Sequence, residues 1–156
     1  MKRPPGVSGE PFPQQPASHR GVTVLSVSAL SDDQLHLRRL FDHTKWALFE
    51  ARTCREAVAI LRRQRVGVVI CEEELPDGDW RDLLRQLRAI PDVPYLIVTS
   101  RLADEQMWVE VLDGGGFNVL EKPFDSTELF RVVSLAWLAW NDRGAWSSRA
   151  AAAGAD

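Results

Sequence analysis

Five short apolar runs alternate with five amphipathic segments between residues 22 and 141 of this 156-residue chain. The runs are rich in valine, isoleucine and leucine, a composition that favours β-strands. They cover residues 22–27, 46–49, 66–71, 95–98 and 117–120. The run VGVVIC at 66–71 has no polar side chain until its end, which is typical of a strand buried on both faces of a sheet.

The segments between these runs carry apolar residues at helical spacing, and three of them begin with a capping-box pattern. The three patterns are SDDQ at 31–34, TCRE at 53–56 and DSTE at 125–128. Two further helices are expected at about 80–89 and 103–112. Strands that alternate with helices predict an α/β fold of three layers, in which helices cover both faces of a five-stranded parallel sheet. The crossovers should be right-handed.

Segments of different composition flank the alternating region. Residues 1–20 hold five of the nine prolines, which predicts a disordered tail. The folded domain should span residues 21–142, and residues 143–156 should form an alanine-rich tail. Only about 15 residues follow the last expected helix. We therefore expect no DNA-binding domain after it, and we expect output through protein partners.

Charge and cysteine content exclude several classes of function. The formal net charge is −3, so neither nucleic acid nor an anionic membrane is expected as a partner. Cys54 and Cys71 are the two cysteines and form no disulfide or metal pattern, which fits the reducing cytoplasm. No apolar stretch is long enough to cross a bilayer, and the N-terminus lacks the apolar region of a signal peptide.

Chemically useful side chains follow three of the predicted strands. Glu72 comes directly after 66–71, Thr99 directly after 95–98, and Lys122 two residues after 117–120. The carboxyl ends of parallel strands meet at one edge of a sheet, where the sites of such folds form. We therefore expect a carboxylate, a hydroxyl and an ammonium group to converge there.

These residues give the chain a resemblance to the receiver domains of two-component response regulators, over about residues 22–141. The turn LPDG at 75–78 is the most specific feature, since receivers place their phosphoacceptor four residues before its proline, and that position is Glu72. Thr99 and the sequence Lys122-Pro123-Phe124 match in order and spacing. The resemblance implies a flavodoxin-like (βα)5 fold and a cis Lys122–Pro123 bond. It also implies a cytoplasmic, non-enzymatic signalling role with histidine kinases or effectors as partners.

The chain departs from the receiver pattern at the residues that handle phosphate. Receivers phosphorylate an aspartate at the position of Glu72 and hold Mg²⁺ with it and an acidic pair just after the first strand. Ser28 and Ala29 occupy those positions, and Asp32 and Asp33 come later. The aromatic switch position is Val119.

Two hypotheses follow from these departures. In the first, Glu72 imitates a phosphorylated aspartate, contacts Lys122 and Thr99, and fixes one conformation. In the second, the chain is an authentic Mg²⁺-dependent receiver, with Asp32 and Asp33 as metal ligands and Glu72 or Asp77 as acceptor. Simpler interpretations stay open as well. Asp32 and Asp33 would favour a helix N-terminus, and the two glutamates that follow Glu72 would be solvated.

The last helix, expected to end near Asn141, is apolar nearly all round. A core stripe is predicted at Leu129, Val132, Val133, Ala136 and Trp140. Phe130, Leu135, Trp137 and Leu138 lie largely off it. By resemblance, a homodimer would form through the fourth helix, the fifth strand and the last helix, with Trp108, Phe130 and Trp137 in the interface. Alternatively, the alanine-rich tail folds back over this face.

A third class of function is a small flavodoxin-like enzyme or cofactor binder. The sequence contains no glycine-rich phosphate loop and no serine–histidine–aspartate set. It therefore favours a signalling module over an enzyme.

Overall fold

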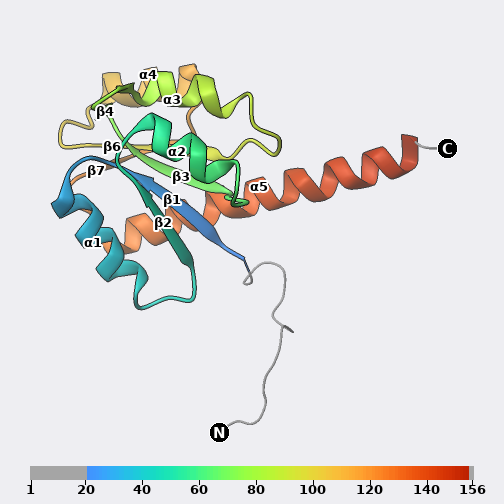
Figure 1. Cartoon of the computed structure of the whole chain (residues 1–156), viewed down its shortest axis with the longest axis horizontal. Helices are drawn as coiled ribbons and strands as arrows, with labels where there is room; N and C mark the ends of the chain where they lie inside the picture. Colours follow the sequence, from blue (N-terminus) through green and yellow to red (C-terminus); the bar gives the residue numbers. More distant parts are fainter. Residues whose placement is uncertain (1–20, 155–156) are drawn as a thin grey trace, which may run out of the picture.

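The computed structural model describes the backbone of residues 21–154 and the side chains of residues 21–143. The expected tail at 1–20 lies outside the described residues. Five parallel strands form one sheet in the order β2-β1-β3-β6-β7 (Figure 1). The strands are β1 (Thr23–Val27), β2 (Ala47–Ala51), β3 (Val68–Glu72), β6 (Tyr95–Ser100) and β7 (Asn118–Glu121). The predicted five-stranded parallel α/β fold is confirmed.

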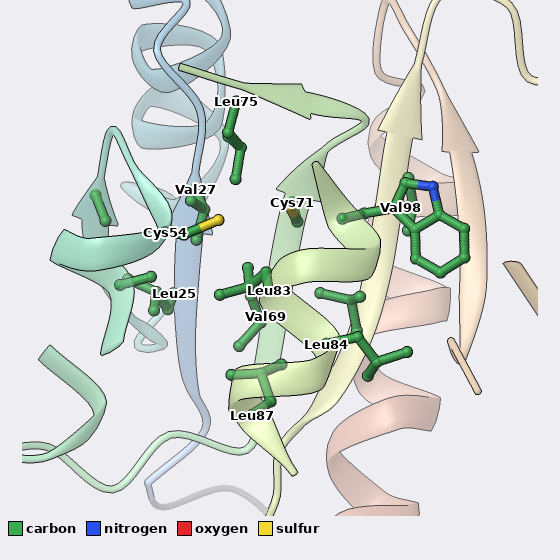
Figure 2. Packing of buried hydrophobic residues seen from close by; sticks show 14 of the residues in the cluster. Leu25, Val27, Cys54, Val69, Cys71, Leu75, Leu83, Leu84, Leu87 and Val98 are labelled. Carbon is green, nitrogen blue, oxygen red and sulfur yellow. The ribbon is translucent and has the colours of Figure 1, made fainter. Parts of the chain in front are cut away.

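Five helices cover the two faces of this sheet. They are α1 (Ser31–Phe41), α2 (Cys54–Leu61), α3 (Trp80–Leu87), α4 (Glu105–Gly114) and α5 (Ser126–Gly154). Helices α1 and α5 pack on one face, and α2, α3 and α4 on the other (Figure 1). Figure 2 shows the second face, where Leu83 and Leu87 of α3 lie close to Val69 of β3. The core thus has two halves that meet at the sheet, as three layers require.

A short hairpin of β4 (Glu74–Leu75) and β5 (Gly78–Asp79) follows β3, where only a turn was predicted. It contains the LPDG turn, in which Gly78 has φ +154°. Leu75 is buried against the core while the turn itself is exposed. The hairpin therefore holds the chain close to the end of β3.

The three predicted capping boxes have different outcomes. Thr53 caps α2 by accepting a hydrogen bond from the Glu56 amide, as the pattern predicts. The box at 31–34 is wrong, because Gln34 is buried and serves the sheet. Its amide group donates to the Ala51 carbonyl at 2.9 Å and accepts from the Ser26 hydroxyl at 2.7 Å. The N-terminus of α1 therefore has no side-chain cap. Helix α5 begins at Ser126, directly after Asp125, and the Asp125 carbonyl accepts a hydrogen bond from the Leu129 amide.

Helix α5 differs from its prediction in length and in its buried face. It continues to Gly154, so an end near Asn141 is wrong, and the chain does not fold back there. Trp137 is 2% exposed and belongs to the core, and its Nε1 donates to the Gly21 carbonyl at 3.3 Å. Gly67 makes room for this packing, since a Cβ there would lie 2.7 Å from Trp140 and 3.1 Å from Trp137. The predicted exposed position of Trp137 is therefore wrong.

No helix in the described part of the chain is both long and apolar enough to cross a membrane.

Candidate functional site

Lys122 lies at the centre of a small ion-pair network at the carboxyl edge of the sheet. Its side chain is only 4% exposed, although it directly follows β7. Its Nζ donates to Asp33 Oδ2 at 2.6 Å and also to Glu72 Oε1. The two carboxylates come from α1 and from the end of β3, and each side chain is 14% exposed. Three elements thus bring one cation and two anions together away from solvent.

Thr99 lies beside this network because the register of the sheet places it there. Strand β3 pairs with β6 so that Glu72 faces Thr99. The Thr99 hydroxyl lies 3.5 Å from Glu72 Oε1 and 3.5 Å from the Cys71 carbonyl. Both distances are long for an O–H donor, for which about 2.7–2.8 Å is usual. The hydroxyl therefore contacts Glu72 only weakly.

Glu73 and Ser100, the next residues along the two chain segments, also pair through a carboxylate and a hydroxyl. The Ser100 hydroxyl donates to Glu73 Oε1 at 2.9 Å, and the Glu73 amide donates to the Thr99 carbonyl at 3.0 Å. Ser100 also accepts from the Leu102 amide at 3.0 Å. Glu73 is thus a partner of β6 and not a solvated neighbour of Glu72, whereas Glu74 is exposed. Sequence reasoning missed Ser100, although it directly follows Thr99 at the strand end.

The two aspartates at the start of α1, Asp32 and Asp33, point in different directions. Asp33 turns inward to Lys122, and the Ser28 hydroxyl lies 3.5 Å from its Oδ2. Asp32 is exposed and lines a cavity of about 250 Å³ together with His36 and Arg101. Only one of the two predicted carboxylates therefore reaches the network.

Burial and charge act in opposite directions on Glu72. Burial raises the pKa of its carboxyl above the ordinary value of 4.5, and the nearby Asp33 adds to this. The hydrogen bond and the charge of Lys122 lower the pKa and offset part of the increase. Counting formal charges, two carboxylates and one ammonium leave the network with one negative charge. The ammonium group is thus the main compensation for both carboxylates.

These residues do not fit a divalent cation. Mg²⁺ prefers near-octahedral oxygen coordination with one or two carboxylates. Asp33 and Glu72 both hold the Lys122 ammonium, Glu73 accepts from the Ser100 hydroxyl, and the positions after β1 are a serine and an alanine. Within the described residues, no group of three or more histidine, cysteine or acidic side chains could hold a metal.

Two other candidate residues have structural surroundings of their own. Asp77 points to α2, where its carboxylate accepts from the Cys54 amide at 2.8 Å and from the Arg55 amide at 3.1 Å. These backbone hydrogen bonds lower the pKa of Asp77. Val119 is 7% exposed and packs in the core. The Lys122–Pro123 bond is cis, as the resemblance implied.

The predicted interface residues are also divided. Trp108 on α4 is 43% exposed. Phe130 is half-buried, and its ring lies 5.5 Å from Trp46 and 6.2 Å from Phe41. It therefore serves the packing of α5 on α1. Because Trp137 is buried, the exposed large apolar residues in the described parts of α4 and α5 are Trp108, Val109, Leu112, Leu135 and Leu138.

Comparisons with known proteins point to one family. The family model of the response regulator receiver domain matches residues 27–134. The chain is 30% identical over 93 residues to the KDP operon transcriptional regulatory protein KdpE of Escherichia coli, covering 60% of this chain and 41% of that protein. It is 33% identical over 118 residues to the regulatory protein TcrX of Mycobacterium tuberculosis, covering 72% and 48%. The chain thus spans about half or less of the length of these curated relatives.

Solved structures agree with this fold. The signal receiver domain of an HD domain-containing protein from Pseudomonas fluorescens Pf-5 has a TM-score of 0.72 at 22% identity, covering 80% of this chain and 92% of that one. The beryllofluoride-activated NtrC4 receiver domain dimer has a TM-score of 0.68 at 22% identity, covering 76% and 98%. At this identity the likeness concerns the fold.

Proposed function

Because this chain belongs to the response regulator receiver domain family of two-component signalling, we propose that it is an atypical member in which Glu72 replaces a phosphorylated aspartate. Such a domain keeps one conformation and acts by contact with signalling proteins, either a histidine kinase or a downstream effector. The observation that carries the proposal is the ion pair between Glu72 and the buried Lys122 ammonium.

The length of the glutamate side chain supports this role. Glutamate extends one methylene beyond aspartate, or roughly 1.5 Å of bond length. The added reach carries the carboxylate to the ammonium of Lys122. For phosphoryl transfer the same reach is unfavourable, because a misplacement of about 1 Å can cost on the order of a hundredfold in rate.

The state of the neighbouring charges supports it further. Phosphoryl transfer to a carboxylate depends on a metal ion to offset the developing negative charge. Here Lys122 already binds both Asp33 and Glu72, so a metal ion would have to displace it from one of them. The alternative acceptor Asp77 holds two backbone amides of α2 and lies outside the network.

Incubation with acetyl phosphate and Mg²⁺ tests the proposal, with intact mass and peptide mapping as the measurement. The wild type should gain no phosphoryl group. A variant that restores the family pattern, with Ser28→Asp, Ala29→Asp and Glu72→Asp, serves as the positive control for the donor. A stable phosphoryl group on Glu72 of the wild type would establish the authentic receiver instead.

A second measurement addresses the fixed conformation. Glu72→Ala should shift the amide resonances of residues 98–104 and 119–124, because it removes the partner that Thr99 and Lys122 share. The donor and Mg²⁺ should leave the wild-type spectrum unchanged. A wild-type spectrum that responds to the donor would contradict a fixed state.

We also propose that the face formed by α4, β7 and α5 joins two copies of the chain. The exposed apolar side chains of α4 and α5 support it, since a contact between two copies there would remove them from water. Trp137→Glu is unsuitable as a test because it would place a charge in the core. Trp108→Glu is the appropriate variant, and light scattering should give a dimer for the wild type and a monomer for the variant. A monomeric wild type contradicts this proposal.

A further inference from the structure

A groove lies at the amino edge of the sheet, on the face covered by α2 and α3. Its cavity volume is about 540 Å³, within the range of roughly 300–1,000 Å³ that ligand pockets occupy. The loops that lead into β3 and β6 form two of its walls. Glu72 and Thr99 lie at the opposite ends of these strands. A strand of five residues at about 3.3 Å each is about 17 Å long, which is the approximate distance from the groove to these two residues. The groove is therefore separate from the ion-pair network.

Apolar side chains form the floor of the groove. Leu61 and Val66 are buried there, and Val58 and Ile90 are half-buried against the core. Ala89 and Pro91 are exposed at its rim. The floor therefore offers apolar contact to a side chain that enters from solvent.

Arginines dominate the rim. Arg62, Arg63 and Arg65 line the groove, and Asp92 is the acidic residue among its lining residues. Asp92 lies 3.5 Å from Arg65, whose guanidinium also lies 4.4 Å from the ring centre of Trp140. Arg62 and Arg63 are exposed and form no ion pair with any residue that the structure describes. The groove thus carries two uncompensated positive charges in a chain whose net charge is −3.

The helix dipole alone does not explain this arrangement. Basic residues are favourable at the C-terminus of a helix, and Arg62 is the C-cap residue of α2. That explains a cation at this point, but not an apolar cavity between the arginines and the end of α3. The combination of an apolar floor and a basic rim is complementary to a ligand with both apolar and acidic side chains.

We propose that this groove binds an acidic peptide segment of a partner protein, with apolar side chains on the floor and carboxylates at Arg62 and Arg63. Residues 1–20 of the chain itself are the wrong charge for it, because they contain Lys2, Arg3 and Arg20 against Glu10. Nucleic acid is less complementary, since stacking aromatic residues and a continuous basic track are absent from the described lining. The inference rests on the proposed function, in which the domain acts through protein contacts.

Titration of the ¹⁵N-labelled full chain with the synthetic peptide DEFLDELLD tests the proposal. Amide resonances should shift at residues 58–66 and 86–94. Arg63→Glu should weaken binding about tenfold, because it turns an attraction into a repulsion. Ala89→Glu, on the opposite rim, should weaken it as well. The matched control Arg39→Glu changes an exposed arginine of α1 on the other face of the sheet, and it should change the affinity less than twofold.

Three further probes test which features of the peptide the groove recognises. A peptide with serine at the apolar positions and one with lysine at the acidic positions should each bind at least tenfold more weakly. A single-stranded oligonucleotide dT12 should do the same. The proposal is overturned if the serine peptide or dT12 binds as tightly as DEFLDELLD. It is also overturned if the resonance shifts occur elsewhere on the chain, or if millimolar peptide causes no shifts. None of these outcomes bears on labelling by acetyl phosphate, so the two proposals fail separately.

Discussion

The two edges of the same sheet are stabilised in different ways. At the carboxyl edge, the buried Lys122 ammonium holds two half-buried carboxylates. At the amino edge, Trp137 and Trp140 pack against Gly67, and their indole nitrogens donate to the carbonyls of Gly21 and Asp92 at 3.3 Å. Apolar packing stabilises the amino edge, whereas ion pairs stabilise the carboxyl edge.

This difference has a functional consequence. Apolar packing depends little on pH or on bound ions, so the amino edge provides a rigid surface beside the groove. Buried charges depend strongly on their partners, because the loss of one partner leaves the other uncompensated. A substitution at one edge should therefore be independent of pH, and a substitution at the other should depend on it.

Trp137→Ala should give the largest loss of stability. Truncation of a buried tryptophan costs about 3–5 kcal/mol, and this one also loses its hydrogen bond to Gly21. Denaturant unfolding at pH 5 and pH 7.5 should give the same loss. Leu102→Ala is the control, since Leu102 is 80% exposed and its loss should stay below about 1 kcal/mol. A small loss for Trp137 would place it outside the core.

Lys122→Met should cost about 3 kcal/mol at pH 7.5, because it leaves two half-buried carboxylates without their cation. The loss should shrink at pH 5, where protonation removes part of the unpaired charge. Unfolding curves of the variant and the wild type at both pH values measure this. Lys45→Met, at an exposed position, should have little effect at either pH. An unchanged loss at both pH values would mean that packing, and not charge, governs this edge.

Glu72→Gln should have a smaller effect than Lys122→Met, because Lys122 keeps Asp33 as a partner. Its signature is the pH dependence. Burial raises the pKa of Glu72 above 4.5 in the folded state, so the folded state binds more protons than the unfolded state just above that value. This contribution to stability is complete below pH 4.5 and is lost as the pH rises through the folded pKa. The stability of the wild type relative to the variant should therefore fall from pH 4 upward. A relative stability that rises with pH would mean that Lys122 outweighs burial.

The sequence was sufficient for the sheet and for the approach of Glu72, Thr99 and Lys122 to one edge. Strand ends are set by apolar runs, and the topology of a parallel sheet brings their carboxyl ends together. The inward turn of Asp33 and the outward turn of Asp32 were beyond sequence reasoning, because the choice depends on how α1 docks.

Gln34 and Trp137 were predicted wrongly for a related reason. Gln34 fits a capping pattern, but buried carbonyls of the sheet offered it stronger partners. Trp137 is adjacent to the predicted stripe of α5, and the missing side chain of Gly67 widened the buried face enough to include it. In both cases tertiary contacts overrode a local pattern.

Asp77 connects the carboxyl edge to α2, and its substitution should have the smallest effect of the four. Its carboxylate serves as an additional cap of α2 by accepting from the Cys54 and Arg55 amides. Loss of a capping side chain costs about 1 kcal/mol, so Asp77→Ala should destabilise the domain by that amount, and Asp77→Asn, which keeps one acceptor oxygen, by less.

The pH dependence of Asp77 should be opposite in sign to that of Glu72. The hydrogen bond from Cys54 lowers the pKa of Asp77 below 3.8. Its contribution is therefore present above pH 3.8 and is lost as the pH falls through the folded pKa. Unfolding of the wild type and Asp77→Ala between pH 2.5 and 6 should give curves that converge at the acidic end. Curves that diverge there would mean that the carboxylate is not the capping group. In that case the LPDG turn would position α2 by its backbone alone.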